Sequence, residues 1–403
     1  MHICYLYPFY PPERESFGIG TFVWEVSHAL VKNPKIQVSI VSKTKNSMNS
    51  FESIDGINVY RISEQETGIN RIIDNLTNHI FSTLFFSIRA RKAILKISKT
   101  HKIDLLEACD FGGDAITLCN QTLQFPLIIR CHTPGFLLDI YNQNEARSSS
   151  VTTSLIEKII LQKAKNIVFP TRGLYDELVK YVKIEGDIVF QPYLIDVHRF
   201  TARHERTGSI KLRIVSIGRV EKRKGSKLLC QAFSQLITDG SNSELYFIGR
   251  DSITEAYNNS YIAYLQKDII PKKVISHVHF LPEINREKLS NTICKFDVLV
   301  LPSLFEGVGY VALEAMASRL PVIGSNHGGT SELIINNQTG FLIDPLSVDE
   351  LYNKLNLFIH NRSLLNIMGE RGLARVKRVY ETQVVIKDIT NYYKKVIKNY
   401  KSI

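Results

Sequence analysis

The stretch FDVLVLPSLFEGVGYVALEA, residues 296–315, joins three segments of different character. An apolar run rich in β-branched residues (296–302) is typical of a buried strand. A loop containing Gly307 and Gly309 follows, and the remainder is an apolar, helix-forming run. A buried strand that passes through a glycine turn into a helix is the repeating unit of a parallel α/β sheet. This stretch therefore predicts an α/β fold.

The same unit recurs in two series. In the first half, strands are expected at 3–7, 37–41, 57–62, 103–108, 126–130, 166–170 and 187–191, and in the second half at 213–218, 244–249, 278–282, 296–302, 321–325 and 340–344. We predict two Rossmann-like domains, 1–196 and 212–381, joined by a polar linker at 197–211. A final helix, 382–403, is expected to pack back on the first domain. Domains of this kind that face a cleft bind ligands at the carboxyl ends of their strands.

The composition fits two globular domains and an anionic partner. The chain has 403 residues, 44% of them hydrophobic, and a formal net charge of +11. The N-terminus MHICYLYPFYPP lacks the features of a signal peptide, and no apolar run reaches the length of a membrane span. The six cysteines contain no CxxC pair and are expected to be free thiols. These features predict a cytoplasmic protein.

Two glutamates flank the glycine loop of the opening stretch. Glu306 precedes the helix and Glu314 lies within it. A glycine loop at a helix start attracts anions, whereas a carboxylate accepts hydrogen bonds from hydroxyl groups. A ligand with both a diphosphate and polyols, a nucleotide sugar, satisfies both features. The alternative is that Glu306 only stabilises the helix dipole and Glu314 is a surface residue, which leaves the repeated glycines unexplained.

Two further junctions have the same form. In IGRVEKRKG (217–225), Arg219 and Lys224 follow a strand and could hold a diphosphate, while Lys222 and Arg223 add undirected charge. In GSNHGGTSELI (324–334), a glycine pair precedes another helix start. Either stretch alone could be an ordinary surface loop. Three such junctions at one sheet edge favour a binding site.

The first domain carries weaker signals. SFGIGTF places Gly18 and Gly20 before a helix expected to begin near Thr21, but the pattern is a truncated GxGxxG. The second strand is not followed by the acidic residue of a dinucleotide site, so an NAD role is disfavoured. His132 lies just past a strand end, where its ring could donate a hydrogen bond to a sugar hydroxyl or a backbone carbonyl.

No His/Cys ligand cluster and no DxD pair occur in the sequence, so no metal and no cofactor are expected. Arg219 and Lys224 would instead neutralise the charge of the leaving group. Neither GxxxxGK[ST] nor GxSxG is present, which disfavours P-loop and α/β-hydrolase functions.

Together these stretches resemble the GT-B glycosyltransferases of family 4, which are retaining enzymes that use nucleotide-sugar donors. FEGVGYVALEA is similar to the family's E-x7-E motif, and IGRVEKRKG to its phosphate-binding stretch. The resemblance covers most of the chain and implies an acceptor-side first domain and a nucleotide-sugar-binding second domain. The chain departs from the family pattern at Lys165-Asn166 and Pro192-Tyr193, outside the donor motifs.

The resemblance also implies residue roles. Glu314 would hold the ribose, Glu306 the donor sugar, Arg219 and Lys224 the departing diphosphate, and His132 would lie beside the reacting sugar. The catalytic set is then Glu306, His132, Arg219 and Lys224, and the donor-binding set is Gly18, Gly20, Arg219, Lys224, Phe280, Leu281, Pro282, Glu306, Gly307, Val308, Gly309, Tyr310 and Glu314.

The predicted function is therefore a retaining, metal-independent glycosyltransferase with a front-face mechanism. A UDP-sugar is the favoured donor and GDP-mannose the next, and the acceptor is a glycan, a lipid-linked molecule or a small molecule. Basic and aromatic residues at 72–100 and 392–401 either bind an anionic membrane surface that carries a lipid-linked acceptor or form an ordinary solvated face. No nucleic-acid module is found. Two alternatives remain: a nucleotide-sugar 2-epimerase of similar fold, and a non-catalytic partner subunit that binds nucleotide sugar.

Overall fold

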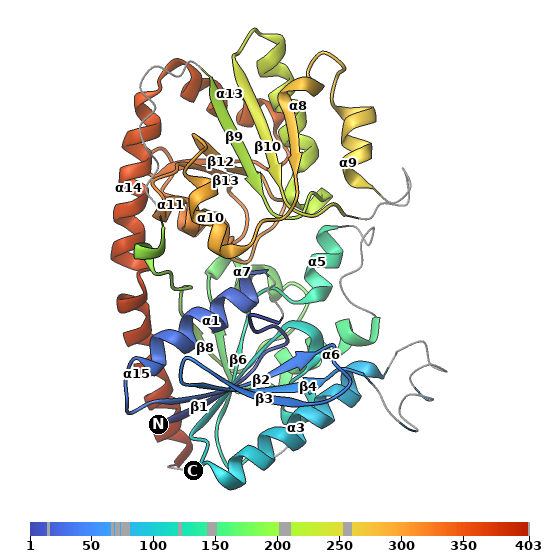
Figure 1. Ribbon diagram of the computed structural model, residues 1–403, viewed down its shortest axis with the longest axis vertical. Coiled ribbons are helices and arrows are strands. Elements are labelled where there is room, and N and C mark those ends of the chain that lie inside the picture. Colours follow the sequence, from blue (N-terminus) through green and yellow to red (C-terminus); the bar gives the residue numbers. More distant parts are fainter. Residues whose placement is uncertain are drawn as a thin grey trace. The chain divides into compact units, whose positions relative to one another are not determined.

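The computed structural model describes residues 1–13, 17–65, 68, 73, 81–119, 123–142, 151–200, 211–252 and 260–401. The chain forms two compact units (Figure 1). Unit 1 comprises Met1–Leu138, Ser148–Leu194 and Thr382–Ile403, and unit 2 comprises Asp139–Arg147 and Ile195–Glu381. The chain passes from unit 1 to unit 2 at Leu194 and returns at Thr382, where the sequence placed domain limits at 196 and 382. Most of the expected linker, 201–210, lies outside the described residues.

Unit 1 is built on an eight-stranded sheet with the order β3-β4-β2-β1-β5-β6-β7-β8. Its strands are β1 (His2–Leu6), β2 (Gln37–Thr44), β3 (Ser50–Ile54), β4 (Ile57–Ser63), β5 (Leu105–Cys109), β6 (Leu127–Arg130), β7 (Asn166–Phe169) and β8 (Asp187–Phe190). Every described pairing is parallel except that of β3 with β4. The central strand β1 is buried at every position, as expected for a parallel strand covered by helices on both faces.

Helices connect these strands. They are α1 (Phe17–Val31), α3 (Ser82–Thr100), α4 (Ile116–Cys119), α5 (Gly135–Tyr141), α6 (Val151–Lys163), α7 (Arg172–Leu178) and the C-terminal α15 (Thr382–Lys401). As the sequence predicted, α15 belongs to unit 1, where it packs beside α1 (Figure 1). Its apolar residues recur at helical spacing, so Val385, Ile389, Tyr393 and Val396 all face the interior.

Unit 2 contains a six-stranded sheet with the order β11-β10-β9-β12-β13-β14. The strands, all paired in parallel, are β9 (Leu212–Ile217), β10 (Ser243–Ile248), β11 (Val278–Leu281), β12 (Val298–Leu301), β13 (Val322–Ser325) and β14 (Gly340–Ile343). The helices are α8 (Ser226–Thr238), α9 (Tyr261–Tyr264), α10 (Arg286–Ile293), α11 (Tyr310–Ala317), α12 (Thr330–Leu333), α13 (Val348–His360) and α14 (Ser363–Val379). The strand order reverses direction at β9, so the loops after β9 and β12 flank a topological switch point.

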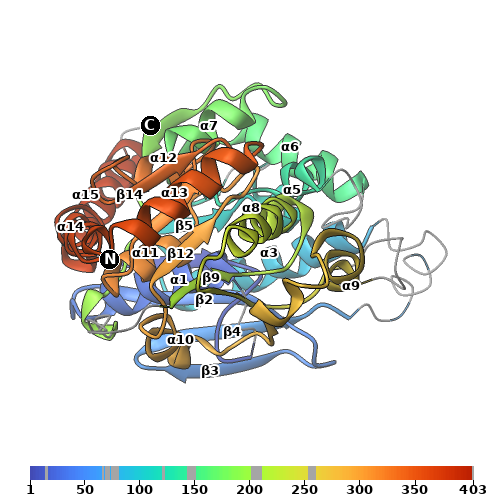
Figure 2. The ribbon, with the colours of Figure 1, turned by 90° about the horizontal axis from the view of Figure 1, so that it is seen from above.

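The core of unit 2 follows from the alternation of side chains along its strands. Val298 and Val300 of β12 point to the same face, where they join a buried cluster with Leu229 and Phe233 of α8. Helices α8 and α13 pack together on that face (Figure 2). The intervening Leu299 is equally buried but belongs to the opposite face. Both faces of the strands are thus buried, so polar side chains are left to the loops at the strand ends.

The prediction of two α/β domains with parallel sheets is confirmed, with two corrections. The sequence pattern does not predict β3, because this strand lies at the sheet edge and exposes Phe51 at 59%, so it has no apolar run. The helix expected to begin near Thr21 begins at Phe17. Gly18 and Gly20 therefore lie at the start of this helix and not in a preceding loop. Glycine can adopt helical backbone angles, so the glycine pattern alone does not mark a loop.

No described helix is long and apolar enough to cross a membrane.

Candidate functional site: the strand-end loops of unit 2

The loops that follow β9, β12 and β13 are in direct contact. These three strands are adjacent in the sheet, so their carboxyl ends lie side by side. The amide of Leu304 donates to the carbonyl of Arg223 at 2.8 Å, and the amide of Gly329 donates to the carbonyl of Glu306 at 2.7 Å. The structure thus brings together the three glycine-containing junctions that the sequence singled out.

Two glycines make this close approach possible. A Cβ at Gly225 would lie 2.0 Å from the carbonyl oxygen of Pro302, and one at Gly328 would lie 2.5 Å from that of Glu306. Both residues also have positive φ angles, +69° and +70°, which side chains disfavour. These glycines therefore allow the loops to approach one another closely, and they also allow the chain to turn.

Glu306 lies at the centre of a cationic cluster. Its Oε1 forms an ion pair with Lys224 Nζ, lies 3.4 Å from Arg223 Nη1 and accepts a hydrogen bond from Ser303 Oγ at 3.0 Å. Burial alone would raise the pKa of Glu306, but the charges of Lys224 and Arg223 and the bond from Ser303 outweigh it and lower the pKa to about 2. Glu306 is thus a carboxylate at any physiological pH.

Arg223 corrects the prediction that this residue and Lys222 only add undirected charge. Its side chain is only 5% exposed. It donates to the Phe305 carbonyl at 2.9 Å and to Glu221 Oε1 at 2.6 Å, in addition to its contact with Glu306. The guanidinium therefore fixes both the backbone and the carboxylate of the loop after β12. Three consecutive cations (222–224) look alike in sequence, and only the turn they form distinguishes the buried one.

Glu221 links the two arginines of this loop. It is 1% exposed, and its second carboxylate oxygen lies 3.6 Å from Nε of Arg219. Arg219 is more open, with a third of its side chain exposed. Arg219 is thus the more accessible cation, whereas Lys224 already pairs with a carboxylate.

The remaining residues of the opening stretch lead into α11. Gly309 is the N-cap of this helix with φ +79°, so no side chain caps its first turn. Gly307, Val308 and Tyr310 are buried, and Glu314 is 5% exposed in the middle of the helix. The two glutamates thus differ as the sequence suggested, one in the loop and one on the helix. The assignment of Glu314 to a ribose stays a prediction.

The expected base-binding residues lie at the end of the edge strand β11. Phe280 stacks on Phe247, with ring centroids 5.1 Å apart, and so belongs largely to the core. Leu281 is 40% exposed and Pro282 is exposed, so these two present the open surface there.

His132 of unit 1 does not offer a free ring donor. It is 4% exposed; its Nε2 lies 3.2 Å from the hydroxyl of Tyr7 and its Nδ1 is hydrogen-bonded to the hydroxyl of Tyr193. In this arrangement both ring nitrogens are engaged with tyrosine hydroxyls, and donation to a sugar hydroxyl or a backbone carbonyl stays a prediction. The sequence could not show that two tyrosines, one before and one after His132 in the chain, would occupy both nitrogens.

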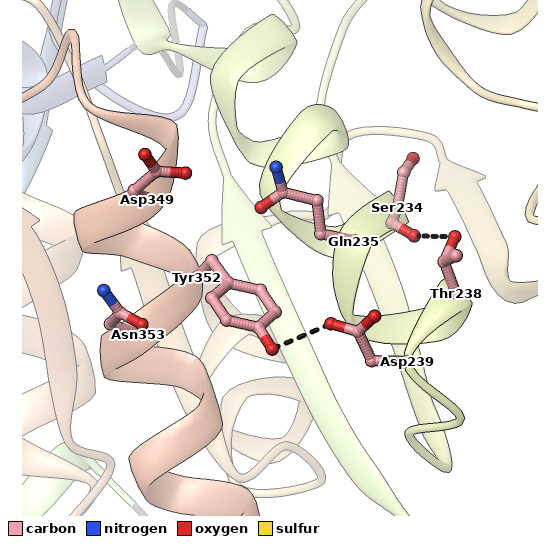
Figure 3. Close-up of a pocket in the computed structure, with 7 residues that line it drawn as sticks. All are labelled: Ser234, Gln235, Thr238, Asp239, Asp349, Tyr352 and Asn353. Carbon is pink, nitrogen blue, oxygen red and sulfur yellow. Dashed lines mark hydrogen bonds between the residues drawn. The ribbon is translucent and has the colours of Figure 1, made fainter.

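A surface hollow of about 580 Å³ lies elsewhere in unit 2 (Figure 3). Its most specific contact is a 2.8 Å hydrogen bond from Tyr352 to Asp239. The last turns of α8 and the start of α13 line it. At 1.5 Å of rise per helical residue, the α8 residues that line the hollow lie roughly 15–20 Å from Lys224, which precedes that helix. The lining residues are Ser234, Gln235, Thr238, Asp239, Asp349, Tyr352 and Asn353. They offer no cation for a phosphate, so the hollow is not the candidate site.

Among the described residues, no group of three His, Cys, Asp or Glu side chains is placed to hold a metal ion.

Comparison with known proteins identifies the two units. Residues 18–199 match the family model Glycosyltransferase Family 4, and residues 202–375 match the model Glycosyl transferases group 1. A curated relative is the capsular polysaccharide biosynthesis glycosyltransferase CapM of Staphylococcus aureus, 24% identical over 259 residues. That match covers 60% of this chain and 65% of CapM, so the chain matches slightly less than two thirds of that relative.

Solved structures share the fold over nearly the whole chain. Sucrose-phosphate synthase from Thermosynechococcus elongatus superposes with a TM-score of 0.78 at 18% identity, covering 99% of both chains. HepE from Anabaena, solved in complex with UDP-glucose, gives a TM-score of 0.69 at 15% identity, covering 98% of this chain and 100% of HepE. Since the two family models together span most of the sequence, this chain is a glycosyltransferase of the GT-B type, with a family 4 domain followed by a group 1 domain.

Proposed function

We propose that this glycosyltransferase moves a sugar from a nucleotide-diphosphate sugar to a hydroxyl group of a glycan, a lipid-linked molecule or a small molecule, with retention of configuration. The observation that carries the proposal is the gathering of Lys224 and Arg223 on Glu306 where three strand-end loops meet. A UDP-sugar is the favoured donor, which the complex of HepE with UDP-glucose supports, and GDP-mannose is the next. The name of CapM supports a role in polysaccharide biosynthesis.

The cluster around Glu306 contains the charges that such a donor needs. A diphosphate brings negative charge that competes with Glu306 for Lys224, because both are anions that a primary ammonium can bind. Arg223 stays on Glu306 through its bonds to Phe305 and Glu221, so the carboxylate remains oriented when Lys224 turns to the phosphate. Glu306 then accepts a hydrogen bond from a hydroxyl of the donor sugar, and Glu314 accepts from the ribose.

The proposed reaction proceeds on one face of the sugar. The acceptor hydroxyl oxygen forms a bond to the anomeric carbon from the side that the leaving phosphate vacates, and the bond from that carbon to the phosphate oxygen breaks. The departing phosphate oxygen takes the proton of the acceptor hydroxyl. The protein positions the reactants and stabilises the diphosphate charge through Arg219 and Lys224, without a step assigned to a metal.

We also propose that unit 1 associates with an anionic membrane surface when the acceptor is lipid-linked. The exposed side of α15 carries Lys387, Lys394, Lys395 and Lys398, and each lysine near such a surface contributes about 1 kcal/mol. Co-sedimentation with vesicles that contain anionic lipid should fall when these lysines are replaced by glutamine. Equal binding of the variant and the native protein would refute this surface.

The donor assignment is tested by a thermal-shift screen against UDP-, GDP- and ADP-sugars. A sugar that binds only the folded state raises the melting temperature by mass action. One nucleotide class should produce a shift that Arg219→Ala and Lys224→Ala reduce and that Lys227→Ala, an exposed cation on α8, leaves intact. A glycosylated product that forms only with added acceptor separates the transferase from an epimerase. No shift with any nucleotide sugar would refute the proposal.

A further inference from the structure

The ring of His132 is enclosed by groups whose protons can be assigned one by one. His132 follows β6, and its two nitrogens meet the hydroxyls of Tyr7 and Tyr193. A neutral imidazole has one N–H donor and one lone pair, so one hydroxyl must accept from the ring and the other must donate to it. The other hydrogen-bond partner of Tyr7 decides which hydroxyl accepts from the ring and which donates to it.

That partner is Glu107, a fully buried carboxylate of β5. Arg130 forms a buried ion pair with it and donates to both of its oxygens, from Nε at 2.8 Å and from Nη2 at 3.1 Å, the bidentate geometry of an arginine with a carboxylate. An ionised carboxylate can only accept hydrogen bonds. Tyr7 therefore donates its single proton to Glu107 Oε1 at 3.0 Å, and Tyr393 of α15 donates to Oε2 at 2.7 Å.

The remaining protons follow. Since the hydroxyl proton of Tyr7 is used, its oxygen accepts from His132, so the imidazole carries its proton on Nε2. The unprotonated Nδ1 then accepts from the hydroxyl of Tyr193. We propose that His132 is a positioning residue: a neutral Nε2–H imidazole, bonded to the protein through both nitrogens, that holds the loop after β6 and takes no part in proton transfer.

The backbone around His132 is anchored on both sides as well. Its amide donates to Asp110 Oδ1 at 2.9 Å. At the start of α5, where this loop ends, the buried carboxylate of Glu157 on α6 accepts from the amides of Gly135 and Phe136, each at 3.0 Å, and also from Gly112 at 2.8 Å. The imidazole is thus one of three groups that hold this segment in place, as expected for a side chain with a positioning role.

The charges around the ring favour its neutral form. Burial lowers the pKa of His132 well below its ordinary value of 6.5, and the nearby positive charge of Arg130 lowers it further. The other groups that face the ring are Phe22 of α1 and the two tyrosine hydroxyls, which are uncharged. Asp110 faces the amide, and burial raises the pKa of its carboxyl well above the ordinary value, so it does not favour an imidazolium.

Nitrogen-15 NMR of histidine-labelled protein tests the proton assignment directly. The His132 signals, identified by their loss in His132→Gln, should show the Nε2–H tautomer and should not titrate between about pH 5.5 and pH 8. An Nδ1–H tautomer, or a titration near pH 6.5, would overturn the proposal. This experiment needs no substrate, so its result is independent of the donor assignment.

Kinetics test the role, which rests on the proposed transferase function. In His132→Gln the side-chain amide can still donate to Tyr7, so kcat should fall by less than about 10-fold and the pH profile should keep its shape. Loss of a general acid or base would instead cost about 10²- to 10⁴-fold. A loss above 100-fold at unchanged melting temperature would overturn the positioning role. If His132→Gln does not fold, Tyr193→Phe serves instead: the Nε2–H tautomer should persist in it, and a switch to Nδ1–H would refute the assignment.

Discussion

The amide of Gly329 donates a 2.7 Å hydrogen bond to the carbonyl oxygen of Glu306, which joins the loop after β13 to the loop after β12. The neighbouring Gly328 approaches the same carbonyl so closely that no side chain fits. The position of Glu306 is therefore set from two directions, by this glycine pair through the backbone and by Arg223 and Lys224 through the carboxylate. A preorganised carboxylate of this kind can bind a sugar hydroxyl without rearranging first.

Replacing Gly328 by alanine should weaken donor binding and lower the melting temperature. The new Cβ would lie 2.5 Å from the Glu306 carbonyl, so the two loops must separate. Gly240→Ala is the matched control, because Gly240 has a similar φ of +84° but nothing within 4 Å of its Cβ position. Differential scanning fluorimetry with and without donor compares the two. Equal losses of stability and binding in both variants would show that backbone strain alone matters.

Arg223→Met should destabilise the protein by about 3–5 kcal/mol. The change leaves the buried carboxylate of Glu221 without its closest cation, and it removes one of the two cations that contact Glu306. Lys227→Met, at an exposed position three residues after Lys224, should change the free energy of unfolding by less than about 0.5 kcal/mol. Urea unfolding monitored by circular dichroism measures both. A change of less than 1 kcal/mol in Arg223→Met would mean that the arginine is as undirected as its sequence context suggests.

The stability contributed by Glu306 should depend on pH in one direction. Its pKa is about 2 in the folded protein, against 4.5 as the ordinary value, so the contribution is complete above about pH 5 and decreases as the pH falls towards 2. Glu306→Gln removes this dependence because an amide does not titrate. The difference in unfolding free energy between native protein and variant should therefore shrink from pH 6 to pH 3. A constant or growing difference would contradict the cluster.

Two tyrosines on α15 give a matched test of the network beneath His132. Tyr393→Phe removes a hydrogen bond to the charged Glu107 and should cost about 1.5–3 kcal/mol. The hydroxyl of Tyr392 is buried but has no hydrogen-bond partner among the described residues, so Tyr392→Phe should be close to neutral. Chemical unfolding of the two variants measures the difference. Equal effects would show that the hydroxyl of Tyr393 does not support the network.

The sequence predicted those parts of the protein that depend on local pattern. β12 is apolar and buried at every position, β9 and β13 are mostly apolar, and each glycine junction follows directly after one of these strands, so the two domains and the three loops could be found. The edge strand β3 could not, because Phe51 and its polar neighbours are half exposed and lack any regular pattern. Local pattern is sufficient only where burial imposes it.

The unpredicted parts of the site depend on contacts between distant residues. Arg223 and Lys222 are neighbouring cations in the sequence, and the turn at 222–224 directs the arginine inward, where Glu221 and the carbonyl of Phe305 in another loop bind its guanidinium. In the sequence, Tyr193 belongs to a departure from the family pattern outside the donor motifs, yet its hydroxyl binds a nitrogen of His132. Such pairings are a property of the folded chain, and a single sequence carries no signal for them.

Isothermal titration of UDP and of uridine into the native protein and Lys224→Met tests the central claim most directly, namely that the cluster around Glu306 receives the diphosphate of a nucleotide sugar. GDP with guanosine and ADP with adenosine extend the test to the other donor classes. We predict that one diphosphate binds the native protein at least 10-fold more tightly than its nucleoside, and that most of this advantage is lost in Lys224→Met but kept in Lys227→Met. A diphosphate that gains nothing over its nucleoside, or an advantage that survives in Lys224→Met, would contradict the account.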